Sequence, residues 1–221
     1  RFNIRDIKPS MKVRSAQIKR YSKPVAPEQT NSDSLHTFLE GRGFRDVGEL
    51  VYRHKIYETA DLKTQGSDLV FQFFDPAGKL VFLKNKPLDY DGNPGMCNQS
   101  GMQQILYGWH TIPDTSRTVW LTEGELDAIA ARELGFPALS LPSGASNLTW
   151  LEAEFDNLAR FEEIVLATDH DEAGEKCAEK LKQRLGDRAF RVRFPAKDIN
   201  ELIQERGYDD ARKILKSSYE D

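Results

Sequence analysis

Carboxylate side chains gather in three separate stretches in the second half of this 221-residue chain. Each stretch directly follows a short apolar run of the kind that forms a buried strand. The five acids that we single out are Glu123, Asp127, Asp169, Asp171 and Asp198. Because the carboxyl ends of parallel strands meet at one edge of a sheet, we expect these carboxylates to share a crevice there.

The spacing within two of the stretches favours convergence. Asp169 and Asp171 are two residues apart where a strand ends, so both side chains can face one side. Glu123 and Asp127 are four residues apart across a strand-to-helix turn, so both can point toward one crevice. Crowded carboxylates raise each other's pKa, and a bound divalent cation removes that repulsion. Oxygen ligands suit Mg²⁺ or Mn²⁺ and not Zn²⁺, and this chemistry is typical of phosphoryl transfer.

Simpler interpretations exist for single residues in this part of the chain. An acidic residue at a helix N-terminus is an ordinary partner of the helix dipole, which is how we interpret Glu125 and Glu172. Three acidic stretches at three strand ends are harder to obtain by chance, so we favour the metal interpretation for the set. The Ser-Gly-Ala-Ser segment at 143–146 fits either a phosphate-cradling turn or a plain turn.

The elements that must position these acids follow from an alternating pattern after residue 117. We expect strands over 118–122, 137–141, 163–168 and 189–194, and helices over 125–134, 147–158, 172–185 and 199–205. Strands that alternate with helices form a parallel sheet with helices on both faces. The prediction for this half is therefore an α/β fold with a central parallel sheet flanked by helices.

The first half has a different pattern, that of a small α+β subdomain with an antiparallel sheet. Short helices are expected over 34–40, capped from within 31–33, and over 46–52, and a hairpin joins strands over 68–74 and 79–84. An exposed loop is expected over 89–103. Lys84 and Lys86 share a strand face, which suits contact with a nucleic-acid backbone, although lysines on edge strands also deter aggregation.

The charge of the chain is unevenly distributed. Residues 1–24 carry eight Lys or Arg and one acid, whereas the other residues carry 23 Lys or Arg and 34 Asp or Glu. A basic arm on an acidic body suits contact with nucleic acid, and a solvated basic linker is an equal alternative. We divide the chain into a basic linker (1–31), an N-terminal α+β subdomain (32–116), the domain with the parallel sheet (117–207) and a C-terminal helix and linker (208–221).

Composition excludes several classes of protein. A hydrophobic fraction of 39% and a charged fraction of 30% are typical of globular proteins and exclude collagen, a coiled-coil rod and a disordered chain. No apolar run approaches the roughly 18 residues of a membrane span, so we expect no membrane partner. Two cysteines cannot form a disulfide framework or a four-thiolate zinc site, which predicts a reducing, cytoplasmic setting. Because the chain begins at Arg1, we expect it to be part of a longer polypeptide.

Three motifs, taken in order, carry a resemblance to a known family. They are Glu123-Gly-x-x-Asp127, Asp169-x-Asp171-x-Ala-Gly174 and Lys197-Asp198-x-Asn200-Glu201. Together they resemble the Toprim fold, which primases, type IA and II topoisomerases and some nucleases share. The similarity is closer to the primase domain of bacteriophage primase-helicases and their Twinkle relatives, over about residues 35–205, with support from 82–86, 105–110 and 140–145. The Lys-Asp-x-Asn-Glu element separates primases from topoisomerases best, because topoisomerases carry a different third segment.

This resemblance implies roles for single residues. The implied catalytic set is Glu123, as general acid or base, with Asp169 and Asp171. The implied metal-binding set is Glu123, Asp127, Asp169, Asp171 and Asp198, with Mg²⁺ or Mn²⁺ as the cofactor. The residues implied to hold the template or a nucleoside triphosphate are Lys84, Lys86 and Lys197. Tyr107 and Trp109 would stack a base if they were exposed, although such aromatics are more often part of a core.

The activity that the resemblance implies is that of a DNA primase. Such an enzyme condenses ribonucleoside triphosphates into a short RNA primer on a single-stranded DNA template, and pyrophosphate leaves. Phage relatives also carry a four-cysteine zinc module and a helicase. Neither the four cysteines nor the G-x-x-x-x-G-K-[ST] motif of a helicase occurs in this sequence. The resemblance therefore implies that both modules belong to other parts of the same parent chain. Two alternatives stay open: a non-catalytic module of a Twinkle-like helicase that binds single-stranded DNA, and a metal-dependent nuclease or topoisomerase fragment.

Overall fold

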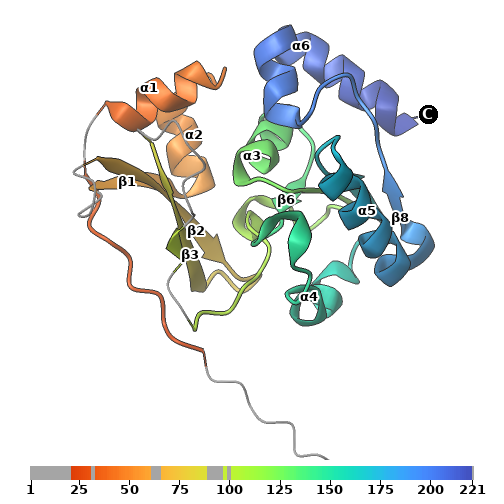
Figure 1. Ribbon diagram of the computed structural model, residues 1–221, viewed down its shortest axis with the longest axis horizontal. Helices are drawn as coiled ribbons and strands as arrows, with labels where there is room; N and C mark the ends of the chain where they lie inside the picture. The colour runs from red at the N-terminus through yellow and green to blue at the C-terminus, as the bar shows by residue number, and fades with distance from the viewer. Residues whose placement is uncertain (1–20, 31–32, 61–65, 89–96, 99–100, 221) are drawn as a thin grey trace, which may run out of the picture.

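A computed structural model describes residues 21–30, 33–60, 66–88, 97–98 and 101–220 of the chain (Figure 1). Within these residues the first half forms an antiparallel sheet with two helices, and the second half forms a parallel sheet with helices around it. The predicted basic linker and the predicted loop over 89–103 lie mostly outside the described residues. The division into four segments stays a prediction.

The first half is built around a sheet of order β1-β2-β3-β4. Its elements are α1 (Ser34–Gly41), α2 (Val47–His54), β1 (Ile56–Ala60), β2 (Ser67–Phe74), β3 (Leu80–Pro87) and β4 (Cys97–Asn98). The predicted hairpin is β2-β3, and its turn closes because Asp75 Oδ1 accepts hydrogen bonds from the Ala77 and Lys79 N–H groups. Strand β1 was not predicted, because buried polar residues such as Thr59 interrupt its apolar pattern.

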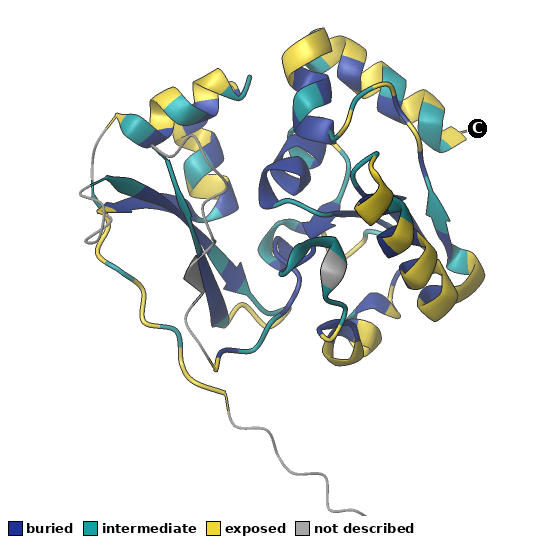
Figure 2. Cartoon of the chain, viewed as in Figure 1, coloured by how far each residue is buried: buried dark blue, intermediate teal, exposed yellow. Residues whose placement is uncertain are grey.

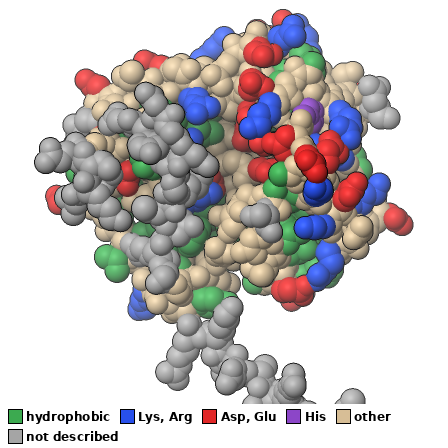
Figure 3. Space-filling view, viewed as in Figure 1, with side chains coloured by type: hydrophobic (Ala, Val, Ile, Leu, Met, Phe, Trp, Pro, Cys, Tyr) green, Lys and Arg blue, Asp and Glu red, His purple; other side chains and the backbone are tan. Residues whose placement is uncertain are grey.

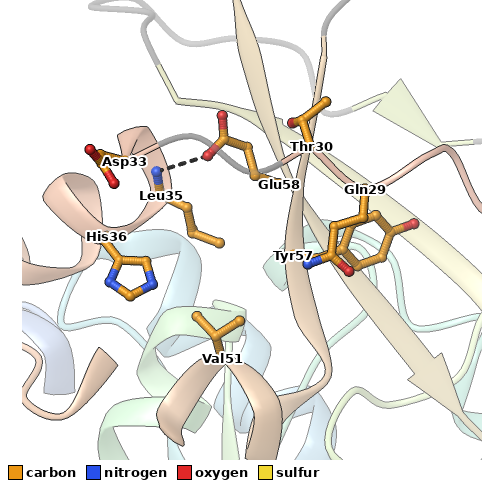
Figure 4. Close-up of a pocket in the computed structure, with 8 residues that line it drawn as sticks. All are labelled: Gln29, Thr30, Asp33, Leu35, His36, Val51, Tyr57 and Glu58. Carbon is orange, nitrogen blue, oxygen red and sulfur yellow. Dashed lines mark hydrogen bonds between the residues drawn. The ribbon is translucent and has the colours of Figure 1, made fainter. Parts of the chain in front are cut away.

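Helix α1 is held by a neighbouring strand rather than by its own N-cap residue. Within the described residues, Asp33 makes no side-chain capping bond. Glu58 of β1 instead accepts the Leu35 N–H at 3.2 Å, across the hollow between the helix and the strand (Figure 4). The prediction of a cap is therefore wrong for Asp33, and positions 31 and 32 lie outside the described residues.

The second half contains the predicted parallel sheet, in the order β6-β5-β7-β8. Its elements are β5 (Thr118–Thr122), α3 (Glu125–Glu133), β6 (Ala138–Ser140), α4 (Leu151–Leu158), β7 (Glu163–Ala167), α5 (Glu172–Leu185), β8 (Ala189–Arg191) and α6 (Ile199–Glu220). Helices α3 and α6 pack together on one face, and right-handed crossovers put α4 and α5 on the other (Figure 1). The predicted α/β fold class is confirmed.

Three elements of this half differ from their predicted bounds by three residues or more, and one of them is β8, which ends at Arg191 instead of 194. Helix α4 begins at Leu151 instead of 147, and the segment 143–146 before it forms a 3₁₀ turn over Gly144–Ser146. The segment is thus not at an α-helix N-terminus. Helix α6 continues to Glu220, but Gly207 interrupts it with φ 71° and ψ 172°, a conformation that favours glycine.

One hydrophobic core connects the two halves (Figure 2). Tyr107 is 1% exposed and joins them directly. Its backbone pairs with Ser140 of β6, and its hydroxyl donates to the His54 carbonyl oxygen of α2 at 2.6 Å. Trp109 is also buried, and its indole N–H donates to Glu154 at 2.6 Å. Both aromatics therefore belong to the core, and the alternative that they stack an incoming base is wrong.

Candidate active site

The acidic stretches lie where the order of the parallel sheet reverses. From β5 the chain crosses to β6 on one side, whereas β7 pairs with the opposite side of β5. Open parallel sheets bind ligands at such a switch point, outside the carboxyl ends of the strands. Glu123 follows β5 directly, and Asp169 and Asp171 follow β7. Acidic side chains gather over this half in Figure 3, with Lys and Arg side chains among them.

Glu123, Asp169 and Asp171 are brought together by the turn into helix α5. Glu123 Oε1 accepts the Asp169 N–H at 3.1 Å, and Asp171 Oδ1 accepts the Gly174 N–H at 2.9 Å as the N-cap of α5. Position 174 must be glycine, because a Cβ there would lie 2.7 Å from Glu123 Oε1 and closer still to the Asp169 carbonyl oxygen. The close approach of α5 to β7 thus places the acids side by side.

The other two acids meet at the start of helix α6. Asp127 Oδ1 accepts the Asn200 N–H at 3.0 Å, and Asp198 Oδ1 accepts the Glu201 N–H at 2.7 Å. Asp127 is buried in the first turn of α3. Four of the five predicted acids therefore each accept a backbone N–H group, which partly offsets the repulsion between them.

The charges of these carboxylates influence one another. Burial, and then the charge of Asp169, raise the pKa of Glu123 to about 7. Burial, and then the charge of Asp198, raise the pKa of Asp127 well above its usual range, and the same two causes raise the pKa of Asp169. Raised pKa values in a crevice mark a site where negative charge is concentrated without enough positive charge to balance it.

The three predicted basic residues lie in different environments. Lys197 is exposed, with Nζ 3.4 Å from Asp169 Oδ2, whose charge raises the pKa of the lysine. Lys86 is half-buried, and with Arg42 it lines a cavity of about 150 Å³ that Asp127 and Asp198 also line. Burial, and then the charge of Arg42, lower the pKa of Lys86.

Lys84 is not available to a template in this structure. Its side chain is 5% exposed, and Nζ lies 2.6 Å from Oε1 of Glu125, which is also buried. Glu125 is thus more than a partner of the helix dipole, because it forms a buried ion pair between β3 and α3. The shared strand face of Lys84 and Lys86 turns toward the second half, as alternation predicts, but only Lys86 reaches the cavity.

Comparison with known proteins agrees with this geometry. Residues 120–203 match the family described as Toprim-like. This segment is a Toprim-like domain. The primase fragment of the bacteriophage T7 primase-helicase protein superimposes with a TM-score of 0.69 at 26% identity, covering 87% of this chain and 79% of that fragment. The predicted resemblance to a Toprim primase domain of phage primase-helicases is confirmed.

Two curated relatives extend the comparison to whole proteins. The chloroplastic/mitochondrial Twinkle homolog protein of Arabidopsis thaliana is 31% identical over 170 residues, which are 66% of this chain and 23% of the relative. The DNA helicase/primase of Enterobacteria phage T3 is 30% identical over 153 residues, which are 67% of this chain and 24% of the relative. The chain therefore spans about a quarter of each of these two proteins.

The crevice that holds Glu123, Asp127, Asp169, Asp171 and Asp198, called the Toprim crevice below, suits a magnesium ion that keeps part of its water shell. It is less suited to an ion that protein side chains surround completely. Within the described residues, no three His, Cys, Asp or Glu side chains are grouped closely enough to hold a metal by themselves. Mg²⁺ is commonly bound by one or two carboxylates, with waters and substrate phosphates completing its shell. Oxygen-only ligands with raised pKa values, such as Glu123 and Asp169, suit that mode of binding.

Three residues contribute to the Toprim crevice that sequence reasoning did not assign. Arg42 lines the cavity beside Lys86, Asn200 holds Asp127, and Arg191 contacts the loop that carries Asp169. Asn200 stands within the quoted Lys-Asp-x-Asn-Glu motif, so its position already carried a signal. Arg191 is an arginine inside a predicted strand, which in principle marks a buried charge that needs a partner. No pattern pointed to Arg42.

Among the described residues, no helix is long and apolar enough to cross a membrane.

Proposed function

We propose that this chain is the RNA-polymerising part of a DNA primase, which joins ribonucleoside triphosphates on a single-stranded DNA template. The observation that carries the proposal is the placement of Glu123 beside Asp169 at the sheet's switch point, near a cavity that Arg42 and Lys86 line. The acidic side chains are thus placed to bind a cation, and the basic side chains are placed to bind phosphate groups beside it. The similarity to the primase fragment from phage T7 supports the same activity.

Each side chain has a role in this proposal. Glu123 has a pKa of about 7, and among the described residues it accepts the Asp169 N–H through Oε1, so we assign Oε2 as the atom that accepts a proton from the attacking 3′-hydroxyl. Asp169 and Asp171 would hold Mg²⁺ or Mn²⁺ together with water and substrate phosphates, and Asp127 and Asp198 keep the adjoining crevice negative. When bound, the cation would neutralise negative charge on the phosphoryl group that is transferred.

The basic residues bind the triphosphate and the template in the same proposal. Arg42 and Lys86 line the same cavity as Asp127 and Asp198 and would contact phosphate oxygens there. Lys197 is exposed beside Asp169 and meets a phosphate at the rim. Lys84 acts indirectly, because it holds Glu125 next to the acids.

The parent protein would supply the remaining parts of a primase. The similarity to a DNA helicase/primase from phage T3 supports a zinc-binding module and a helicase in the same polypeptide. The low cysteine count supports a reducing compartment, such as the cytoplasm of a bacterium or a phage-infected cell.

RNA synthesis on single-stranded DNA, with labelled ribonucleotides and Mg²⁺, tests the proposal in the parent protein. Glu123→Gln keeps the shape of the side chain and removes its proton acceptor, so we expect a loss of about 10²- to 10⁴-fold in rate. The matched control is Glu172→Gln, three residues after Asp169, which changes an exposed glutamate that pairs only with Lys176 among the described residues. This control should retain the wild-type rate.

A second candidate function is supported by the similarity to the Twinkle homolog. In that case the chain binds single-stranded DNA for a helicase without catalysis. Equal and negligible RNA synthesis by wild type and Glu123→Gln, together with unchanged DNA binding, favours this second function. Nicking of DNA with Mg²⁺ and no nucleotide would instead indicate a nuclease.

A further inference from the structure

Arg191 occupies an unusual place for an arginine, beneath the loop that carries Asp169 and Asp171. It is the last residue of β8, beside Leu166 of β7. Its side chain is only 12% exposed. A buried guanidinium is costly unless its N–H groups find partners, so the contacts that it makes explain why it can lie there.

These contacts join the two ends of the loop. One terminal nitrogen of Arg191 donates to Thr168 Oγ1 and, at 3.0 Å, to the Gly174 carbonyl oxygen. The other donates to the Asp169 carbonyl oxygen at 3.0 Å and to the Thr168 carbonyl oxygen at 3.4 Å. Thr168 Oγ1 itself donates to the Gly174 carbonyl oxygen at 2.9 Å. One rigid planar group therefore binds the end of β7 and the first turn of α5.

Only an arginine can make this set of bonds. The guanidinium has five N–H donors in a fixed plane, whereas a lysine ammonium is a single point of charge on a flexible chain. The carbonyl oxygens of Thr168, Asp169 and Gly174 point into one small space and would repel one another without a donor between them. Glu175 Oε1 lies 3.0 Å from a terminal nitrogen of the same guanidinium, so both terminal nitrogens have partners, whereas Nε has none among the described residues.

We propose that Arg191 is a positioning residue that holds the 168–174 loop so that Asp169 and Asp171 face Glu123. It touches neither substrate nor cation, and it acts through the backbone. The inference rests on the proposed function, because it holds that Arg191 orders the loop so that the loop can bind a divalent cation. Residues that orient metal ligands typically contribute 10- to 100-fold to metal affinity.

The test compares Arg191→Lys with the control Arg193→Lys. Arg193 is exposed and contacts Glu175 as Arg191 does, but none of the loop carbonyls. In the metal-free chain, amide hydrogen exchange over 169–175 should accelerate on the order of 10-fold in Arg191→Lys, with the core strands unchanged. Mn²⁺ affinity, measured by electron paramagnetic resonance of the free ion, should fall by about 10- to 100-fold. The control should match wild type in both measurements.

Activity gives a further readout in the parent protein. Arg191→Lys should lower kcat at limiting Mn²⁺, leave the KM for the ribonucleotide unchanged, and regain rate at saturating Mn²⁺. Thr168→Val, which removes the hydroxyl that links Arg191 to Gly174, gives a second and milder test if Arg191→Lys does not fold. Wild-type exchange and Mn²⁺ affinity in the folded variants would overturn the inference. A wild-type chain that binds no Mn²⁺ would overturn the proposed function, and this inference with it.

Discussion

The two sheets of this protein handle buried charge in opposite ways. In the antiparallel half, the buried cation Lys84 is matched by one buried anion, Glu125, at 2.6 Å. At the edge of the parallel sheet, carboxylates lie together with too few cations, and backbone N–H groups stabilise four of them. The first arrangement joins two parts of the molecule and needs no ligand. The second keeps negative charge concentrated, as a site for a cation requires.

The largest loss of stability should come from breaking the buried Lys84–Glu125 ion pair. Lys84→Met leaves Glu125 buried without its cation, which typically costs about 3–5 kcal/mol of unfolding free energy. The double variant Lys84→Met/Glu125→Met removes both charges and should recover most of that loss, because apolar replacements of a buried pair are often neutral. Urea unfolding measures both. A loss below about 1 kcal/mol for the single variant would mean that the pair is solvated in solution.

A substitution at Gly174 should be the next most damaging, now at the acidic edge. Gly174→Ala forces a Cβ against the Asp169 carbonyl and Glu123 Oε1, which should cost about 3 kcal/mol and displace the acids. The matched control is Gly48→Ala in α2, where a Cβ meets nothing within 4 Å. The control should gain about 0.5–1 kcal/mol, because alanine favours a helix. Thermal or urea unfolding should separate the two variants, and equal stabilities would contradict the close approach of α5 to β7.

The parallel sheet was predictable from sequence because its signals are local. Strand β5 and helix α5 have the predicted bounds, since each combines a clear period with an end signal, such as the glycine after Leu185. The convergence of Glu123 with Asp169 was also predictable, because the switch-point rule converts strand order into position. Their chemical roles stay predictions.

The interaction between the halves could not be predicted in the same way. Lysine is almost always exposed, so nothing local indicated that Lys84 would be buried against an acid 41 residues away. That Glu58, and not Asp33, accepts an N–H group of α1 likewise depends on where β1 lies. Helix α4 starts four residues late because Asn147 Oδ1 accepts the Thr149 N–H in a turn that periodicity does not reveal. The first two of these features arise from tertiary contacts, which a local pattern does not contain.

Stability against pH should distinguish the acidic edge from an ordinary ion pair. The pKa of Glu123 is about 7 in the folded chain and near 4.5 when unfolded, so the folded state binds the extra proton between these values. Wild-type stability should therefore fall as pH rises through this window. Without metal, Glu123→Gln lacks this penalty, so it should be more stable than wild type by about 2 kcal/mol at pH 8, a value reduced for solvent screening.

At pH 4 the advantage of Glu123→Gln should vanish, because Glu123 is then protonated in both states. Asp127 and Asp169 add slopes of the same sign to both proteins, so the difference between the two curves isolates Glu123. Urea unfolding in the presence of a chelator at several pH values measures it. A constant difference across the series would contradict the concentration of negative charge at this edge.

The smallest effect should come from Asp33, which stands before α1 at the position that Asp171 occupies before α5. Asp171 caps α5 by accepting the Gly174 N–H, whereas Asp33 makes no capping bond among the described residues of α1. Asp33→Ala should therefore cost less than about 0.5 kcal/mol, below the roughly 1 kcal/mol of a working cap. Glu58→Gln tests the substitute partner, because an amide oxygen accepts the Leu35 N–H more weakly than a carboxylate and should cost more than Asp33→Ala. The reverse order in urea unfolding would return the capping role to Asp33.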